Sequence, residues 1–242
     1  MTLRAYVYSF VVTNSRDSQA QAALSVLMQD SVKLTQLLTR FTAWVGDADV
    51  ETLLEDSALA RAHAYLLRRS FEEARHLMSP AEESLAAELE VSSGAAWRQL
   101  YQNMTSQLLV PLELNGKQVE LPMSQVRNLA QDADRDVRRR AHEAEIAAWR
   151  RASLPLAAAL NSIKGQVVTL AGRRGWESPL DVSLFDNGID RATLDAMMGA
   201  ARESFPDFRR YLRAKARLIG VERLAWYDLF APVGGGGRAW TY

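Results

Sequence analysis

Three histidines, His63, His76 and His142, are the side chains in this sequence best suited to metal or acid–base chemistry. A His-Glu-x-x-His helix holds a zinc ion between two histidines four residues apart, and its glutamate activates the bound water. The nearest stretch begins with His142 and Glu143, but Ile146 stands where the second histidine would have to be. The motif is therefore incomplete.

A carboxylate-bridged di-iron site needs two Glu-x-x-His pairs and two further glutamates inside a helical bundle. Glu73 and His76 form one such pair, whereas neither His63 nor His142 has a glutamate three residues before it. Half of a ligand set does not hold a metal. The favoured interpretation of the charged stretch 72–76 is a solvated helix face.

Other chemistries have no complete motif either. No Gly-x-Ser-x-Gly turn marks a nucleophilic serine, although the members of a Ser–His–Asp triad meet only in space, so spacing does not exclude one. The glycines at 234–237 lack the Lys-Ser/Thr ending of a phosphate-binding loop and fit a flexible connector. The sequence thus assigns no catalytic, cofactor-binding or metal-ligating residue.

The charge balance argues against nucleic acid as a partner. Lysine plus arginine and aspartate plus glutamate both number 29, so the basic surplus of a nucleic-acid binder is missing. The one basic run is interleaved with acidic residues, which predicts a solvated helix face. Its arginines are Arg135, Arg138, Arg139 and Arg140.

The sequence points to a cytoplasmic protein that does not span a membrane. The absence of cysteine excludes disulfides and thiolate metal sites and favours a reducing compartment. No apolar run reaches the length of about 18 residues that a transmembrane helix needs. The shorter apolar stretch at residues 5–12 is expected to be a buried helix or strand rather than a secretion signal.

Helical periodicity dominates the rest of the chain, which is long enough for one large domain or two small ones. Ser79 is an expected N-cap with Pro80 at the first helical position, and Gly175 is an expected C-terminal stop. Asp134 and Asp190 are expected caps of later helices, and Ser92 or Ser93 is expected to open another. Four large side chains, Trp97, Met104, Met197 and Met198, are expected to fill the core. The expected helices span about residues 18–45, 50–77, 79–91, 93–109, 134–149, 154–174, 190–204 and 205–220.

One segment breaks the helical pattern. Residues 110–114 and 117–121 flank Asn115-Gly116, a pair that favours the tight turn of a β-hairpin. We therefore expect an all-α protein of mostly long antiparallel helices, with one small β-hairpin near residues 110–121 that leans on the helices around it. The predicted parts are a helical segment at 1–109, the hairpin, a helical segment at 122–232 and a flexible glycine-rich end at 233–242.

Four segments in the C-terminal third resemble a known family. In chain order they are Gly175-Trp176-Glu177-Ser178-Pro179-Leu180-Asp181, Asn187-Gly188-Ile189-Asp190, Tyr211-Leu212-Arg213-Ala214-Lys215 and Tyr227-Asp228-Leu229-Phe230-Ala231-Pro232. Together they resemble the oligoendopeptidase F branch of the thimet-oligopeptidase-like zinc metallopeptidases. The likeness extends upstream through residues 13–22, 77–83 and the hairpin, so it covers nearly the whole chain.

The resemblance implies the N-terminal portion of such an enzyme only. Members of the family carry a His-Glu-x-x-His helix and a later glutamate ligand downstream of the Tyr-Asp-Leu segment, and these residues have no counterpart here. Zinc is therefore expected in a C-terminal catalytic domain outside these 242 residues, and this chain alone is expected to be inactive. In the full enzyme it would form one wall of a cleft for short peptide substrates.

The same residues also fit a different class of protein. A free-standing helical binding or scaffold module without enzymatic activity would have the same sequence features. Whether the chain is a truncation, one product of a split gene or an independent protein stays open at this point.

Overall fold

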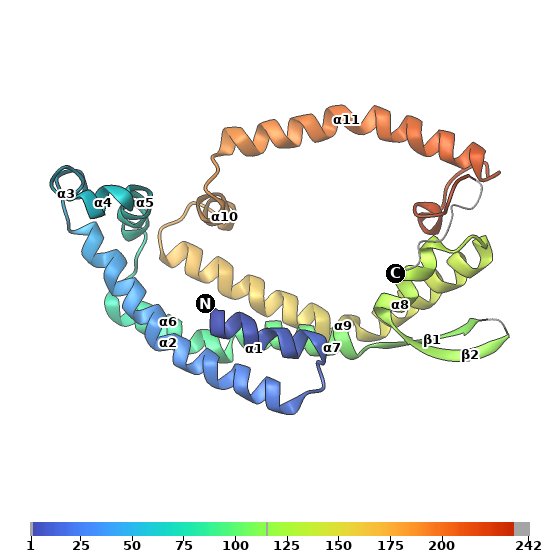
Figure 1. Cartoon of the computed structure of the whole chain (residues 1–242), viewed down its shortest axis with the longest axis horizontal. Coiled ribbons are helices and arrows are strands. Elements are labelled where there is room, and N and C mark those ends of the chain that lie inside the picture. The colour runs from blue at the N-terminus through green and yellow to red at the C-terminus, as the bar shows by residue number, and fades with distance from the viewer. Residues whose placement is uncertain (1, 115, 235–242) are drawn as a thin grey trace. The chain divides into compact units, whose positions relative to one another are not determined.

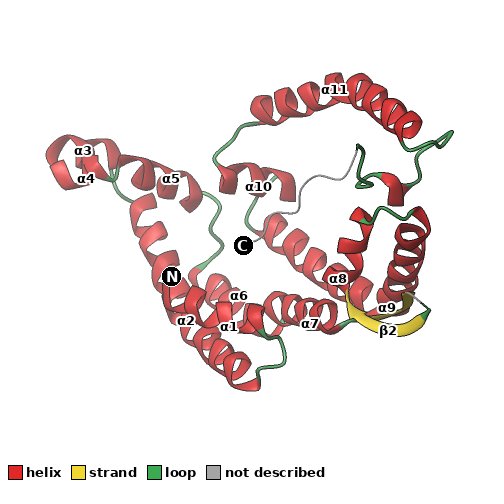
Figure 2. Ribbon diagram, turned by 45° about the vertical axis from the view of Figure 1, so that its right-hand side comes forward, coloured by secondary structure: helices red, strands yellow, loops and turns green. Residues whose placement is uncertain are grey.

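The computed structural model describes residues 2–114 and 116–234 and is built almost wholly of α-helices (Figures 1 and 2). The predicted all-α class and the hairpin are both confirmed. None of the described helices is long and apolar enough to cross a membrane. The helices are α1 (Thr2–Thr13), α2 (Ser18–Gly46), α3 (Val50–Asp56), α4 (Ala58–Ala62), α5 (Ala64–Ala74), α6 (Pro80–Ser92), α7 (Gly94–Gln107), α8 (Met123–Asn128), α9 (Arg135–Arg173), α10 (Pro179–Asn187) and α11 (Arg191–Leu218). Strands β1 (Leu109–Leu114) and β2 (Lys117–Pro122) form the hairpin, and short 3-10 helices occupy Leu129–Gln131 and Trp226–Asp228.

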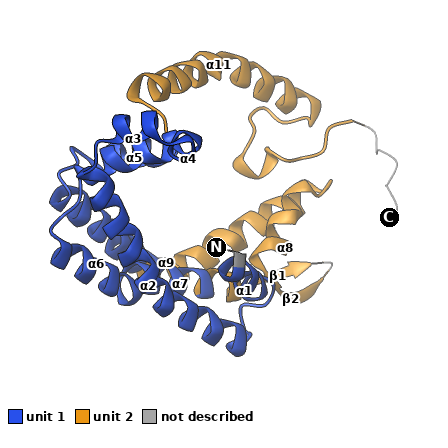
Figure 3. Ribbon diagram, turned by 60° about the vertical axis from the view of Figure 1, so that its left-hand side comes forward, with its two compact units in different colours: residues 1–103, 156–187 blue, residues 104–155, 188–242 orange. Residues whose placement is uncertain are grey.

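The chain divides into two compact units (Figure 3). Unit 1 comprises residues 1–103 and 156–187, and unit 2 comprises residues 104–155 and 188–242. The parts expected from the sequence follow chain order rather than this division, and their boundaries stay a prediction. The expected flexible end lies mostly outside the described residues, which stop at Gly234.

Unit 1 is organised around α2, which packs against α1, α5 and α6. The side chain of Asp17 accepts hydrogen bonds from the backbone N–H groups of Gln19 and Ala20, so that two otherwise unpaired donors at the start of α2 are satisfied. The main core of this unit gathers at the other end of α2 and consists of Val45, Val50, Leu54, Ala60 and Leu67.

The single helix expected over residues 50–77 is wrong, because the structure divides this stretch into α3, α4 and α5. Ser57 ends α3 and caps α4, since its Oγ accepts a hydrogen bond from the N–H of Ala60. His63 breaks the helix a second time, between α4 and α5. The breaks turn the apolar residues of three short helices toward Val45, which one straight helix could not do.

The next helix starts as the sequence indicates. Ser79 Oγ accepts from the N–H of Glu82, and the Glu82 carboxylate accepts from the N–H of Ser79. This reciprocal capping box fixes the first turn of α6 behind Pro80. Ser93 separates α6 from α7, close to the predicted start at Ser92 or Ser93.

Unit 2 contains the hairpin and the helices that support it. The strands pair antiparallel, with Val110 opposite Leu121 and Leu112 opposite Val119. Gly116 has φ +73°, which a glycine adopts readily, whereas Asn115 of the predicted turn lies outside the described residues. The apolar face of the hairpin packs on α8 and α9 in a core made of Val110, Leu112, Met123, Val126, Ala141 and Ala148.

Two helices expected on either side of residue 152 form one continuous helix, α9, of 39 residues. Asp134 caps its start as predicted, since its carboxylate accepts from the N–H of Asp136. Pro155 lies inside the helix, where it removes one backbone hydrogen bond and costs about 3 kcal/mol. Ala152 and Ala159, on either side of Pro155, are buried, so the helix is packed on both sides of the proline.

The helix expected to start at Phe205 and Pro206 does not exist as a separate element. Asp190 caps α11, as predicted, by accepting from the N–H of Thr193 at 2.7 Å, and the helix then continues through Pro206 to Leu218. Met197 and Met198 were expected in the core but are 59% and 45% exposed on this helix.

The apolar stretch at residues 5–12 is helical, but most of it is not buried. It forms α1, in which Val11 is 4% exposed while the apolar side chains of Leu3, Tyr6 and Val12 are mostly exposed. The expectation of a buried element was therefore wrong for all but one side of this helix.

The crossing of α2 and α5 leaves no room for a side chain at Gly46. A Cβ at this position would lie 2.4 Å from the Cβ of Ala74. We predict that Gly46→Ala lowers the free energy of unfolding, because overpacking costs about 1–3 kcal/mol whereas alanine gains at most about 1 kcal/mol over glycine in a helix. Urea unfolding followed by circular dichroism measures this change.

Gly165 provides the matched control, since a Cβ there would meet nothing within 4 Å. Gly165→Ala should therefore raise the stability by about 0.5–1 kcal/mol. Adding Ala74→Gly to Gly46→Ala should restore much of the lost stability. Equal stabilisation by both single alanine variants would contradict the close approach of α2 and α5.

Candidate functional site

The three histidines lie in different surroundings. His63 is exposed between α4 and α5, and His142 is half-buried with its ring centre 6.0 Å from that of Tyr227. Throughout residues 2–114 and 116–234, no three histidine, cysteine, aspartate or glutamate side chains are grouped so that they could hold a metal ion. The described residues therefore do not fit the zinc that the resemblance implies for the whole enzyme, and no hydrolytic step is derived from them.

His76 is not on the solvated face that the sequence predicted. Its ring stacks on Trp176 with the centres 3.5 Å apart and the planes 11° apart. Its Nδ1 lies 3.1 Å from the carbonyl oxygen of Arg174. Glu73, the other half of the expected ligand pair, is exposed. His76 thus joins the end of α5 to the loop after α9, within unit 1.

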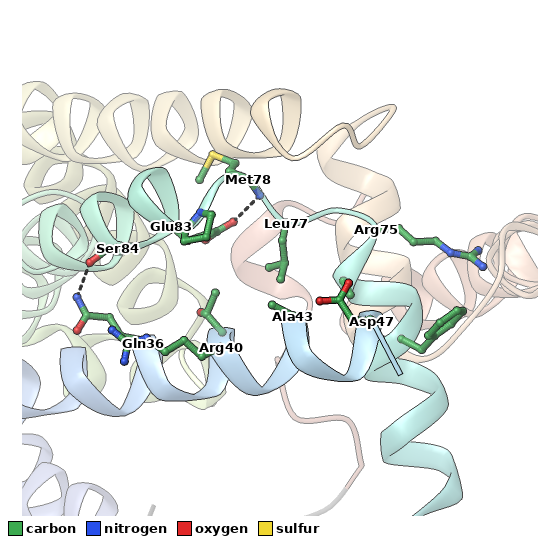
Figure 4. Close-up of a pocket in the computed structure, with 14 residues that line it drawn as sticks. Gln36, Arg40, Ala43, Asp47, Arg75, Leu77, Met78, Glu83 and Ser84 are labelled. Atoms are coloured by element: carbon green, nitrogen blue, oxygen red, sulfur yellow. Dashed lines mark hydrogen bonds between the residues drawn. The ribbon is translucent and has the colours of Figure 1, made fainter. Parts of the chain in front are cut away.

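One candidate site in unit 1 is a cavity of about 470 Å³ beside α2 (Figure 4). Three- and four-residue steps place Gln36, Arg40, Ala43 and Asp47 on one face of α2 toward this cavity. The last turn of α5, the loop after it and the first turns of α6 form most of the rest of the lining. Their residues are Phe71, Ala74, Arg75, Leu77, Met78, Pro80, Glu83 and Ser84.

The lining of the cavity combines apolar side chains with charged and polar ones. Arg75 pairs with Glu72 at 2.6 Å, and Gln36 donates to Ser84 Oγ at 2.8 Å. Arg40 and Asp47 add a positive and a negative side chain to the same lining. The cavity can therefore hold an organic group that has both apolar and charged parts, but its lining offers no paired nucleophile and base.

Glu83 is the buried charge behind this cavity. Its carboxylate accepts two hydrogen bonds from Arg174, at 3.0 and 2.7 Å, and one from the N–H of Met78 at 3.1 Å. Burial raises the pKa of Glu83, but the hydrogen bonds and the positive charge of Arg174 outweigh this effect and hold the pKa below its ordinary value. The Glu83 carboxylate therefore has a structural role, which is to hold Arg174 and the N–H of Met78 in place.

A second cavity of about 290 Å³ lies on the other side of Glu83 and shares Thr39, Leu77 and Glu83 with the first. It is lined by the stacked pair His76 and Trp176 and by residues of α10. Both cavities are therefore shaped by the loop after α5, which the Glu83–Arg174 pair and the His76–Trp176 stack hold in place.

Unit 2 contains a buried ion cluster that the sequence did not reveal. The carboxylate of Asp228 is 0% exposed and accepts hydrogen bonds from Arg135 and Arg138 at 3.0–3.3 Å. The N–H of Ala225 donates to it at 3.0 Å. Burial raises the pKa of Asp228, but the arginine and backbone hydrogen bonds together move the pKa below its ordinary value.

The prediction of a solvated basic run is wrong for one of its four arginines, since Arg135 is 44% exposed although it pairs with Asp228. Arg138 is 3% exposed and also donates to three carbonyl oxygens, those of Asp132, Ala133 and Tyr227. Arg139 remains on the surface, paired with Asp136 and Glu143. One signal was available in the sequence, because Arg138 lies three residues before Ala141 and ten before Ala148, on the buried stripe of α9.

A second contact in unit 2 ties α11 to the segment that follows it. Lys215 is 5% exposed, and its Nζ donates to the carbonyl oxygen of Leu229 at 2.7 Å. Asp228 and Leu229, neighbours in the Tyr-Asp-Leu segment, are therefore both held by cationic side chains from helices.

The sequence matches known peptidases over a limited share of their length. The Oligopeptidase F family model matches residues 44–108. Group B oligopeptidase PepB of Streptococcus agalactiae is 21% identical over 252 residues, which cover 99% of this chain and 41% of that protein. An oligoendopeptidase F homolog of Lactococcus lactis is 22% identical over 177 residues, covering 70% of this chain and 28% of that protein.

Solved structures show the same fold. Oligoendopeptidase-F from Enterococcus faecium matches 97% of this chain and 47% of its own, with a TM-score of 0.85 and 20% identity. The chain resembles the N-terminal portion of oligoendopeptidase F. A putative oligoendopeptidase F from Bacillus anthracis matches 96% of this chain and 42% of its own, with a TM-score of 0.68 and 16% identity. The resemblance expected from the sequence is confirmed, and the chain spans less than half the length of these relatives.

The segments that resemble oligoendopeptidase F, and residues beside them, make structural contacts within their units. In unit 1, Trp176 stacks on His76, and Asp186 pairs with Arg69 at 3.4 Å. In unit 2, the contacts of Lys215 and Asp228 join the end of α11 and the start of α9 to the Tyr-Asp-Leu segment. These contacts connect parts of the chain that are far apart in sequence.

Replacing Asp228 by asparagine should destabilise unit 2. Asp228→Asn would leave Arg138 buried without an anionic partner, which costs about 3–5 kcal/mol. Urea unfolding followed by tryptophan fluorescence measures the loss. Asp207→Asn removes an exposed carboxylate that pairs with Arg210 and should change the stability very little.

A double variant distinguishes loss of the Asp228–Arg138 ion pair from nonspecific destabilisation. Asp228→Asn combined with Arg138→Met removes both buried charges, so it should be clearly less destabilised than the sum of the two single variants. Strict additivity of the two changes would contradict a direct interaction between these side chains.

Glu83 should make the stability of unit 1 depend on pH. Its folded-state pKa lies below the value of about 4.3 expected for the unfolded chain, so its contribution is complete above that pH and is lost as pH falls through the folded-state pKa. Glu83→Gln should therefore lower the stability at pH 7 and flatten its decline below about pH 5.

Urea unfolding at pH 7, 5, 4 and 3 measures both effects. Glu72→Gln, which alters an exposed ion pair with Arg75, should leave the pH profile as it is in the unchanged chain. Parallel profiles for the unchanged chain and Glu83→Gln would rule out this role for the Glu83–Arg174 pair.

Proposed function

We propose that this chain is the N-terminal, non-catalytic portion of a cytoplasmic zinc metalloendopeptidase that cleaves short peptides. The observation that carries the proposal is the extent of the likeness, which covers nearly all of this chain and less than half of oligoendopeptidase-F from Enterococcus faecium. The 242 residues hold no His-Glu-x-x-His sequence. In this proposal the zinc ligands belong to a C-terminal catalytic domain, which is the principal partner of the chain.

The role proposed for the chain is to form one wall of the substrate cleft. A wall that encloses an extended peptide aligns it with the reacting groups and keeps folded proteins out. The described helices supply rigid surface for this task, since ion pairs and caps fix their ends. The catalytic power would come from the other portion.

A fusion protein tests the proposal directly. Residues 1–242 would be joined to the part of the Enterococcus faecium enzyme that lies outside the match, and a quenched-fluorescent peptide would report cleavage. We expect chelator-sensitive cleavage by the fusion, and neither cleavage nor stoichiometric zinc in elemental analysis of the chain alone.

The matched control is the same fusion with the glutamate of the enzyme's His-Glu-x-x-His replaced by glutamine, which should be inactive. A folded fusion without activity would contradict the proposal. Chelator-sensitive turnover by the chain alone would show instead that the chain has its own metal centre.

A further inference from the structure

Helix α11 carries a long apolar stripe that the rest of unit 2 leaves largely uncovered. In the 28 residues of the helix, apolar side chains recur at three- and four-residue steps, which places them on one face. We call this face the α11 stripe and define it by Leu194, Met197, Met198, Ala201, Phe205, Phe208 and Leu212. Phe205 is 48% exposed and Phe208 is 62% exposed, far more than phenylalanines of a packed helix.

The opposite face of α11 is charged and suited to water. Glu203 and Arg210 lie on it, and Arg210 pairs with Asp207 at 3.1 Å with both side chains exposed. A helix with one apolar and one charged face is expected to bury the apolar one against another element. The exposed stripe therefore indicates a missing partner rather than a helix that is stable alone in water.

The stripe continues a contact that is already formed. At the C-terminal end of α11, Lys215 and Ala216 are buried and Lys215 holds the carbonyl oxygen of Leu229. The helix is thus fixed at one end in unit 2, as a single element without a break at Pro206 (Figure 1). Because this end is anchored, a partner could cover the stripe without having to order the whole helix first.

The likeness to solved structures indicates what kind of body covers the stripe. A match over 97% of this chain leaves out far fewer than the 28 residues of α11, so the shared fold includes most of this helix. More than half of the Enterococcus faecium chain lies outside the match. That portion is large enough to supply a packed layer over the stripe.

We propose that the α11 stripe is the docking surface for the C-terminal catalytic portion of the peptidase. This inference rests on the proposed function and goes beyond it by naming the face through which the two portions join. A membrane surface fits less well, because Asp195, Glu203 and Asp207 stand among the arginines of the charged face, whereas membrane-surface helices are dominated by Lys and Arg there.

Hydrogen exchange of α11 in the fusion described above tests the proposal. Backbone amides of residues 197–208 are expected to exchange at least tenfold more slowly in the active fusion than in the chain alone. Phe205→Ser combined with Phe208→Ser should leave the circular dichroism of the chain alone nearly unchanged, because both side chains are already exposed there. In the fusion the same pair should remove the protection.

Glu203→Ser combined with Arg210→Ser is the matched control, since it changes two side chains on the opposite face of the same helix. It should leave the protection in the fusion within twofold. An active fusion in which residues 197–208 exchange as fast as in the chain alone would overturn the docking surface and leave the proposed function intact. An inactive, folded fusion would overturn both.

Hydrogen exchange of the chain alone would detect two other partners for the α11 stripe. Protection that rises with protein concentration would identify a second copy as the partner. Protection that appears only with vesicles of phosphatidylserine and phosphatidylcholine would identify a membrane. Either result, together with an unprotected stripe in the fusion, overturns the proposal.

Discussion

The buried carboxylate of Asp228 is the constraint on which unit 2 depends. A carboxylate without water is costly unless it is paired and fully hydrogen-bonded, and here two arginines and a backbone N–H satisfy it. Satisfying Asp228 fixes the start of α9 relative to residues 225–229. Lys215 then holds the next carbonyl group, so α11 is anchored to the same segment. One ionised side chain thus determines where three elements of this unit meet.

Unit 1 likewise contains a buried carboxylate that is paired with an arginine. Glu83 at the start of α6 is paired with Arg174 at the end of α9, and the carbonyl oxygen of Arg174 contacts His76, which in turn stacks on Trp176. These contacts hold the loop after α5, the segment that shapes both cavities of this unit. In both units, residues of the peptidase-like motifs serve to join distant segments. The motifs therefore have a structural role within each unit.

The exposed stripe of α11 fits the proposal that this chain is one portion of a larger enzyme. The chain has enough internal contacts to define its helices, but large apolar side chains remain in water on α11. Exposed apolar surface on this scale is typical of an interaction surface. An exposed apolar face of this kind would suit the cleft wall proposed above, which has to be held against the groups that perform the reaction.

The sequence by itself determined the local features of this protein. Asp17, Ser79 and Asp190 cap helices, and the hairpin forms around Gly116, because each of these signals acts within a few residues. The family resemblance was likewise readable from the order of the motifs. Only the tertiary structure decided that α9 and α11 continue through Pro155 and Pro206, and that Arg138, Glu83 and Asp228 are buried in ion pairs. The physical reason is that packing around Pro155, beside the buried Ala152 and Ala159, can outweigh a local helix-breaking signal. The partners of these charges also lie about 90 residues away along the chain.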